Sequence, residues 1–243
     1  EKFMLLTLFE KKQEAKDVMS FKFNSDEPLN WKPGQYLFYT FPNNNPDDRG
    51  VTRYFTISST PFEKDIMITT RISLPAGRQV LPSSTFKKSL TEMKIGDRIT
   101  ASGPDGDFTV YSDLIGVGDP NKNYVFIAGG IGITPFRSIL LDLNHKKLPV
   151  SVQLLYANSD ENIVFKEELE SLVSKNPNFK INYFISPQRI DTSTIEQLNN
   201  INNRMFYISG PSPMVKASSE ILTNMGIPSK NIKLDFFPGY PSY

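Results

Sequence analysis

The sequence pattern changes near residue 118, and this change limits the folds that the chain can adopt. Before it, short β-type runs alternate with turn clusters rich in Gly, Pro, Asn and Asp. After it, apolar strand-like runs alternate with helical segments. The first pattern is typical of an antiparallel barrel or sandwich, and the second of a doubly wound parallel sheet. We therefore predict two domains, residues 1–118 and 119–243.

The first domain is expected to contain six short strands and one helix. The strands are predicted at residues 3–9, 18–24, 36–41, 52–58, 66–72 and 97–102. The helix is predicted at "SSTFKKSLTEM", with a Ser or Thr capping its start. Six short strands with so little helix favour a small antiparallel β-barrel.

The second domain begins with "NYVFIAGG", an unbroken apolar run typical of a strand that is buried on both faces. Further strands are predicted at residues 149–158, 179–186, 204–210 and 231–237, and helices at 134–145, 161–176, 191–199 and 212–226. Strand–helix alternation of this kind predicts a parallel, doubly wound α/β sheet.

The composition removes several classes of site. The chain has no cysteine, which excludes disulfides, thiolate zinc sites, cysteine-ligated iron–sulfur clusters and thiol catalysis. Its one histidine, His145, stands beside two lysines in "LNHKKLP", at an expected exposed helix end. A histidine-based triad or a multi-histidine metal site is therefore not expected, and no metal is predicted.

The charge balance and the apolar runs indicate where the chain works. The net charge of +1 gives no reason to expect binding to nucleic acid or to an acidic membrane. The run "YVFIAGGIGITPF" is too short and too rich in glycine to span a bilayer, and no secretory signal opens the chain. We therefore predict a cytoplasmic location. The first residue is Glu1 rather than Met, which leaves open that the sequence is part of a longer protein.

The segment "AGGIGITPFRS", residues 128–138, joins the first buried strand of the second domain to its first helix. Its three glycines allow backbone N–H groups to approach a ligand closely. Thr134 is expected to cap the helix, and Pro135 suits its first turn. A helix N-terminus after such a loop favours a bound pyrophosphate, so we predict dinucleotide binding. The alternative is a tight turn that merely needs glycines, since Pro135 takes the last position of G-x-G-x-x-G.

Six motifs follow one another in an order that resembles the two-domain ferredoxin–NADP reductase-type flavoproteins. They are "WKPGQY" (31–36), "RYFT" (53–56), "SSTFKKSL" (83–90), "GDRITASGPDGDF" (96–108), "GGIGITP" (129–135) and "YISGPSPMV" (207–215). The resemblance covers nearly the whole chain. It implies a flavin-binding β-barrel followed by a nucleotide-binding α/β domain, with FAD as the flavin and NADH or NADPH as the electron donor.

In the first domain, the resemblance assigns "RYFT" to the flavin. Strand alternation places Arg53 and Phe55 on one face, and Tyr54 and Thr56 on the other. Arg53 is expected to bind the flavin pyrophosphate, because a guanidinium forms bidentate hydrogen bonds to phosphate oxygens. Phe55 is expected to stack on the flavin ring, and Thr56 to lie near the atom that accepts the hydride. The alternatives are a surface salt bridge for Arg53 and a core position for Phe55.

Other candidate flavin ligands lie near the predicted helix and on the preceding strand. The hydroxyl residues Ser83, Ser84 and Thr85 are expected to hold the far side of the pyrophosphate, or simply to cap the helix. Arg71 is a further candidate, whereas Arg78 falls in a loop where the resemblance gives no fixed alignment. Together with Tyr54 on the strand, these residues complete the predicted flavin site.

In the second domain, the resemblance places the nucleotide in two segments. The phosphate ligands are expected to be Gly130, Gly132, Ile133 and Thr134, and the segment under the nicotinamide to contain Gly210, Pro211 and Met214. Many relatives have a cysteine just before this G-P, where the present chain has Ser209. We predict catalytic roles for Thr56, Ser209 and Asp235, the last as a proton relay.

Donor choice depends on the loop "YANSDENIVFKEEL". Asn158, Ser159 and Lys166 could hold a 2′-phosphate, but Asp160 and Glu161 repel one. We therefore favour NADH, or dual use of NADH and NADPH. At the C-terminus, one of the aromatic residues Phe237, Tyr240 and Tyr243 is expected to cover the flavin, or else to pack as an ordinary tail.

The resemblance implies that hydride passes from NAD(P)H to FAD and that electrons then reach a separate acceptor. A ferredoxin or flavodoxin is one acceptor class, and Lys87, Lys88 and Lys94 would form a basic docking edge for it. A small-molecule acceptor is another. Two alternatives stay open. One is a nucleotide-binding or electron-transfer subunit of a larger, membrane-associated redox complex without independent turnover, and the other is a binding module for a different phosphate ligand.

Overall fold

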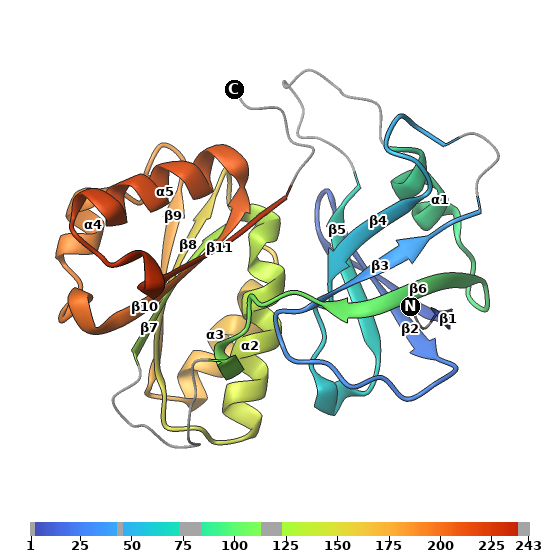
Figure 1. The fold of residues 1–243 in the computed structure, drawn as a ribbon, viewed down its shortest axis with the longest axis horizontal. Helices are drawn as coiled ribbons and strands as arrows, with labels where there is room; N and C mark the ends of the chain where they lie inside the picture. The colour runs from blue at the N-terminus through green and yellow to red at the C-terminus, as the bar shows by residue number, and fades with distance from the viewer. Residues whose placement is uncertain (1–2, 43–45, 73–83, 113–122, 238–243) are drawn as a thin grey trace. The chain divides into compact units, whose positions relative to one another are not determined.

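The computed structural model describes residues 3–42, 46–72, 84–112 and 123–237 and separates the chain into two compact units (Figure 1). The units are Glu1–Thr109 and Val110–Tyr243. The domain boundary predicted at residues 118 and 119 lies outside the described residues and stays a prediction.

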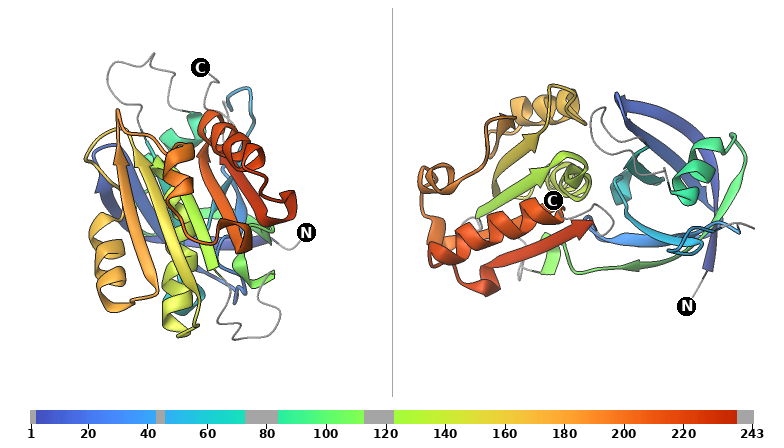
Figure 2. Two further views of the ribbon diagram at one scale, coloured as in Figure 1. Left: turned by 90° about the vertical axis from the view of Figure 1, so that its left-hand side faces the viewer. Right: turned by 90° about the horizontal axis from the view of Figure 1, so that it is seen from above.

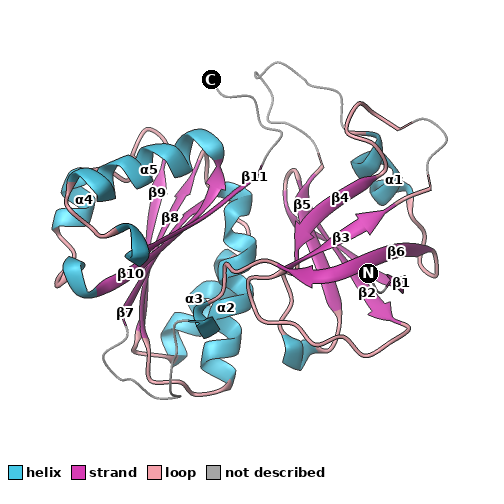
Figure 3. Cartoon of the chain, viewed as in Figure 1, coloured by secondary structure: helices cyan, strands magenta, loops and turns pink. Residues whose placement is uncertain are grey.

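The first unit is a six-stranded antiparallel sheet with the strand order β4-β3-β6-β1-β2-β5. The strands are β1 (Phe3–Ala15), β2 (Val18–Ser25), β3 (Tyr36–Thr40), β4 (Thr52–Thr56), β5 (Ile66–Arg71) and β6 (Arg98–Asp105), so all six predicted strands are present (Figure 3). The sheet curls toward closure, because the N–H of Ser58, just after β4, donates to the carbonyl of Met67 on β5 at 2.8 Å. Within the described residues no ladder joins β4 to β5, which makes the predicted barrel a half-barrel.

The core of this unit is built from the alternating inward residues of its strands. Leu6, Leu8, Phe21, Phe23 and Leu37 have no exposed surface. Full burial of such side chains stabilises the folded state by about 1.5–3 kcal/mol each. The helix α1 (Thr85–Glu92) adds Phe86 and Leu90 to the same core. Ser84 caps α1 as predicted, because its hydroxyl accepts a hydrogen bond of 3.2 Å from the Lys87 N–H.

The second unit is a five-stranded parallel sheet with the order β11-β10-β7-β8-β9. The strands are β7 (Asn123–Gly129), β8 (Ser151–Asn158), β9 (Phe179–Ile185), β10 (Arg204–Pro211) and β11 (Ile232–Phe237). The helices are α2 (Ile133–His145), α3 (Lys166–Lys175), α4 (Thr192–Glu196) and α5 (Ser212–Asn224) (Figure 2). The chain returns to the centre of the sheet and then extends it on the other side, which confirms the doubly wound arrangement.

The apolar run of β7 explains why this strand occupies the centre. Its alternate residues face different helices: Phe126 stacks on Phe136 of α2 with ring centroids 4.6 Å apart. Val125 and Ile127 instead join the core cluster that contains residues of α4 and α5. A strand covered on both faces needs an unbroken apolar run, and "NYVFIAGG" supplies it.

Candidate functional site

Arg53 lies on β4, and its guanidinium is engaged by the turn that precedes this strand. Its Nη1 donates to the carbonyl oxygens of Arg49 at 2.8 Å, Gly50 at 3.0 Å and Thr52 at 2.8 Å. Its Nη2 donates to the carboxylate of Asp47. Its Nε is buried, and no partner for it is found among the described residues. One edge of the guanidinium is therefore only half used.

The carboxylate of Asp47 connects Arg53 to the first turn of α1. Asp47 Oδ2 accepts hydrogen bonds from the backbone N–H of Thr85 at 3.2 Å and from its hydroxyl at 3.3 Å. Partial desolvation raises the pKa of Asp47, but hydrogen bonds from Arg53 and Arg49 outweigh it and hold the pKa below its ordinary value. An anion therefore already sits where a guanidinium, a hydroxyl and a helix N-terminus converge. We call the donors of Arg53 and Thr85 the anion cradle.

Two further cations lie beside the anion cradle. Lys87 on α1 is largely buried, and its ammonium donates to the carbonyl of Arg71 at 2.8 Å. Burial and the positive charges of Arg49 and Arg71 lower the pKa of Lys87 to about 8. Arg71 itself lies 3.8 Å from Asp17. This part of the unit is thus rich in positive charge beside the predicted flavin ligands.

The position of Lys87 corrects one prediction. Lys87 does not belong to an exposed docking edge, because its side chain turns inward to the Arg71 carbonyl. Lys88 and Lys94 are exposed, as expected for a basic edge. Buried and exposed lysines look alike in sequence, and "FKKSL" does not indicate which of its two lysines lies against the neighbouring strand.

The remaining residues of "RYFT" alternate as predicted. Tyr54 is 38% exposed and Thr56 is 7% exposed at the end of β4. Phe55 is partly buried at the rim of the core, with its ring 5.6 Å from Phe86. Tyr54 packs on the other side of the strand, 5.2 Å from Tyr36. The predicted stacking of Phe55 on a flavin remains a prediction.

The two predicted nucleotide segments of the second unit lie directly against each other. A Cβ on Gly132 would lie 2.1 Å from the carbonyl oxygen of Ser209, and one on Gly129 would lie 2.3 Å from the sulfur of Met214. A Cβ on Gly210 would lie 3.2 Å from the Cα of Gly129. The glycine loop after β7 and the G-P segment after β10 therefore form one surface at the carboxyl ends of the central strands.

The start of α2 differs from the prediction in one respect. The helix begins at Ile133, with Gly132 at the N-cap and no side-chain cap. Thr134 is therefore not the cap; it lies within the first turn and is buried. Gly130 adopts a positive φ of 50°, which lets the loop turn into the helix. The first-turn N–H groups that lack a side-chain cap are the kind of donors that bind phosphate.

Ser209 and Asp235 form a hydrogen-bonded polar pair at the ends of β10 and β11. Ser209 has no exposed surface, and its hydroxyl donates to Asp235 Oδ2 at 3.0 Å. Burial raises the pKa of Asp235 to about 6, although the Ser209 hydrogen bond opposes the change. Asp235 can therefore gain or lose a proton near neutral pH, as the predicted relay requires.

Asp235→Asn is expected to change how stability depends on pH. Between the ordinary pKa of 3.8 and about 6, the folded protein binds more protons at this carboxyl than the unfolded chain. Stability contributed by Asp235 therefore falls as pH rises through this window, and the asparagine variant escapes the loss. We expect the variant to gain about 1–3 kcal/mol over the wild type above the window and little below it.

The measurement is urea unfolding across this pH range, with Glu220→Gln as an exposed control in the same unit. The control should shift stability equally at both ends of the range. A variant that is less stable than the wild type above the window would contradict the burial of an unfavourable charge at Asp235.

The loop after β8 carries the residues predicted to distinguish NADH from NADPH. The Nδ2 of Asn158 is buried, and it has no partner in the described part of the chain. Ser159, Asp160 and Glu161 are exposed. Lys166 points its ammonium at the ring of Tyr183, 5.5 Å from the centroid. The unpaired amide fits a ligand group at this strand end, and the exposed acids make the loop a poor place for a phosphate dianion.

Some predicted residues fall outside what the structure describes. These are Arg78, Ser83, Tyr240 and Tyr243. For Phe237 the structure gives the backbone, at the end of β11 beside Pro211, but not the side chain. Their predicted roles stay predictions.

Three residues that support the sites were not predicted from the sequence. Asp47 and Arg49 lie in "PNNNPDDRG", which indicates only a turn. The hydroxyl of Tyr156 donates to the carbonyl of Gly130 at 3.0 Å and ties β8 to the glycine loop. A tyrosine inside an apolar strand gives no sign of such a bond.

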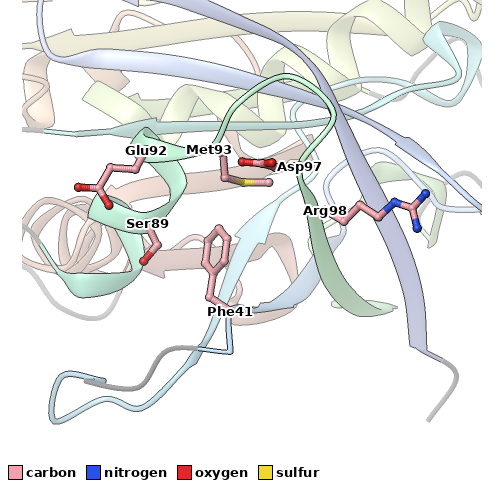
Figure 4. A pocket seen from close by; sticks show the side chains of 6 residues that line it. All are labelled: Phe41, Ser89, Glu92, Met93, Asp97 and Arg98. Atoms are coloured by element: carbon pink, nitrogen blue, oxygen red, sulfur yellow. The ribbon is translucent and has the colours of Figure 1, made fainter.

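A shallow pocket of about 370 Å³ lies elsewhere on the first unit. It is lined by Phe41, Ser89, Glu92, Met93, Asp97 and Arg98 (Figure 4). Figure 4 shows the side chains of Glu92 and Arg98 at opposite ends of it. None of the predicted flavin residues lines this pocket, so it is separate from the anion cradle.

Comparison with known protein families gives two matches that follow the two units. The family described as "Oxidoreductase FAD-binding domain" matches residues 5–110. The family described as "Oxidoreductase NAD-binding domain" matches residues 126–220. The chain is a ferredoxin–NADP reductase-type oxidoreductase. Its cofactors are accordingly FAD and a nicotinamide nucleotide, which confirms the cofactor prediction.

Solved structures of this type share the fold. The cytochrome b5 reductase domain of Ulva prolifera nitrate reductase has a TM-score of 0.79 at 23% identity, and the alignment covers 96% of this chain and 97% of that one. The ferredoxin–NADP⁺ reductase from Plasmodium falciparum has a TM-score of 0.76 at 19% identity, covering 97% and 96%. At these identities the likeness supports the reductase fold only.

Among curated relatives, one component of the Na⁺-translocating NADH-quinone reductase recurs. The protein from Haemophilus influenzae is 29% identical over 212 residues, which are 79% of this chain and 50% of the relative. The protein from Shewanella denitrificans is 28% identical over 233 residues, covering 88% and 55%. The chain thus spans about half the length of the curated relatives it matches.

The residues of this reductase fit its cofactors. The anion cradle offers charge-assisted donors for the two phosphates of FAD, and the buried Nε of Arg53 is a donor still to be satisfied. The paired segments at Gly132 and Ser209 offer a surface without side-chain obstruction at the end of a parallel sheet, where nucleotides bind in such folds.

Proposed function

We propose that this oxidoreductase takes hydride from NADH onto FAD and passes the electrons to a separate acceptor. The observation that carries the proposal is the anion cradle, where Arg53 and the first turn of α1 hold one carboxylate between them. FAD, when bound, supplies the hydride acceptance and the one-electron chemistry. The chain supplies binding, orientation and electrostatics.

The roles of individual residues follow from their positions. Arg53, Thr85 and Ser84 hold the pyrophosphate, with Arg71 and Lys87 adding positive charge. Thr56, at the end of β4, offers its hydroxyl near the reacting end of the flavin. Gly130, Gly132 and the first turn of α2 hold the nucleotide phosphates, while Gly210, Pro211 and Met214 underlie the nicotinamide. The Ser209–Asp235 pair handles the proton.

NADH is the proposed donor in preference to NADPH. The exposed carboxylates Asp160 and Glu161 adjoin Ser159, where a 2′-phosphate would need positive charge. The names of the curated relatives also specify NADH. Both points support the same donor.

For the acceptor there are two candidates. A small redox protein such as ferredoxin or flavodoxin could dock on the exposed Lys88 and Lys94. The curated relatives favour the second candidate, in which the chain works as an electron-transfer part of a larger quinone-reducing assembly. No helix within the described residues is long and apolar enough to cross a membrane. The cytoplasmic location stays a prediction.

Steady-state assays with NADH separate the two candidates. An independent reductase should reduce flavodoxin or ferredoxin at a rate that falls with ionic strength and falls again in a Lys88→Glu, Lys94→Glu variant. An electron-transfer part of a larger assembly should reduce an artificial acceptor such as ferricyanide, but neither protein. Failure to reduce any acceptor, despite bound FAD, would contradict the proposed turnover.

A further inference from the structure

We propose that the carboxylate of Asp47 is an internal competitor for the flavin phosphate, and that it must leave the anion cradle before the phosphate binds. Asp47 then sets the flavin affinity of this chain rather than contributing a contact to the flavin. The inference rests on the proposed flavin-binding role of Arg53 and Thr85.

The contacts of Asp47 are those that a bound phosphate would make. Its two oxygens accept from the Arg53 guanidinium, from the Thr85 amide at 3.2 Å and from the Thr85 hydroxyl at 3.3 Å. These donors are a charged fork, a helix N-terminus and a hydroxyl, which together form a typical oxyanion site. A carboxylate and a phosphate cannot both occupy these donors.

The fit of Asp47 to the cradle is incomplete. Arg53 presents Nη2 and Nε on one edge, and this edge can form two parallel bonds to a single anion. Asp47 engages Nη2 only, and the buried Nε has no partner among the residues that the structure describes. A phosphate that takes this edge side-on would satisfy both donors. The cradle therefore favours a phosphate over its present occupant.

The surrounding charge favours the exchange as well. Arg49 and Lys87 lie beside the cradle, and the positive charges of Arg49 and Arg71 are strong enough to disfavour the charged form of Lys87. In the described part of the chain, Asp47 and Asp17 are the carboxylates paired with the arginines of this region. The cations here outnumber these two carboxylates, and a pyrophosphate with two negative charges would balance the excess.

Asp47 can move without unfolding its surroundings. It lies in the turn before β4, where its backbone carbonyl accepts from the Gly50 N–H at 2.9 Å and its N–H donates to the Thr85 hydroxyl at 3.1 Å. These backbone bonds do not involve the carboxylate. Rotation of the side chain therefore empties the cradle while the turn stays in place.

The test compares flavin-free wild type with Asp47→Asn and with the control Asp48→Asn, an exposed neighbour that carries the same charge. Calorimetry with inorganic pyrophosphate and fluorescence titration with FAD give the dissociation constants. If Asp47 fills the cradle about nine-tenths of the time, its removal should tighten both ligands about tenfold. Asp48→Asn should change them far less, because it alters only the general field.

Unchanged or weaker pyrophosphate binding in folded Asp47→Asn would overturn the inference, and would mean that Asp47 holds Arg53 in place. Asp47→Ala, which cannot hydrogen-bond to the cradle, should also bind pyrophosphate more tightly. If pyrophosphate binding tightens but the wild type binds no FAD, the competition stands and the proposed flavin function fails.

Discussion

Arg53→Ala is expected to yield protein that purifies largely without flavin. The substitution removes the bidentate donor of the anion cradle, and charge-assisted hydrogen bonds contribute about 1.5–3 kcal/mol each. Loss of two such bonds corresponds to roughly two to four orders of magnitude in Kd. The measurement is the ratio of flavin to protein absorbance after purification, followed by titration of the flavin-free protein with FAD.

Controls are needed because Arg53 also holds the turn before β4 through three carbonyl oxygens. Arg53→Lys keeps the charge but not the fork, so it should bind FAD with intermediate affinity. Circular dichroism should show that both variants remain folded. A full complement of flavin in Arg53→Ala would mean that the arginine is only a structural support for the turn.

Gly132→Ala is expected to destabilise the second unit and to weaken nucleotide binding strongly. The new Cβ would lie 2.1 Å from the Ser209 carbonyl oxygen and 2.7 Å from the Gly210 Cα, and both of these are backbone atoms. Gly132 has an ordinary φ of −61°, so the cost is steric and not conformational. Overpacking of this kind costs typically about 1–3 kcal/mol, and forcing the two segments apart also disturbs the predicted phosphate and nicotinamide contacts.

The matched control is Gly226→Ala, which reverses the two causes. Gly226 has a φ of +81°, and a Cβ there would meet no atom within 4 Å. Its variant should lose stability through backbone strain alone and keep nucleotide affinity. Thermal unfolding and NADH binding measured for both variants separate the two effects. Normal NADH binding in Gly132→Ala would contradict the paired-segment site.

The order of elements was predictable because each has its own local signal. The β7 run is apolar throughout since both faces are covered, and the alternation of Arg53 to Thr56 matches the exposure observed on β4. Gly132 was also identifiable, although its true constraint is the carbonyl of Ser209, which lies far later in the chain.

The errors share a physical cause, which is that side-chain direction depends on tertiary neighbours. Thr134 looked like a cap, but α2 starts one residue earlier because the loop packs against β10. Lys87 looked exposed, yet the carbonyl of Arg71 draws it inward. Asp47 looked like an ordinary turn residue, and only the fold brings it to Arg53 and Thr85 together.

An anaerobic absorbance titration of the purified protein, with NADH and separately with NADPH, tests the central claim most directly. We expect the protein to carry the visible absorption band of a flavin, and NADH to bleach it more efficiently than NADPH. A band that neither nucleotide bleaches would contradict the reductase function while leaving the flavin site intact. Absence of flavin, even after incubation with FAD, would contradict the assignment of Arg53 and the anion cradle.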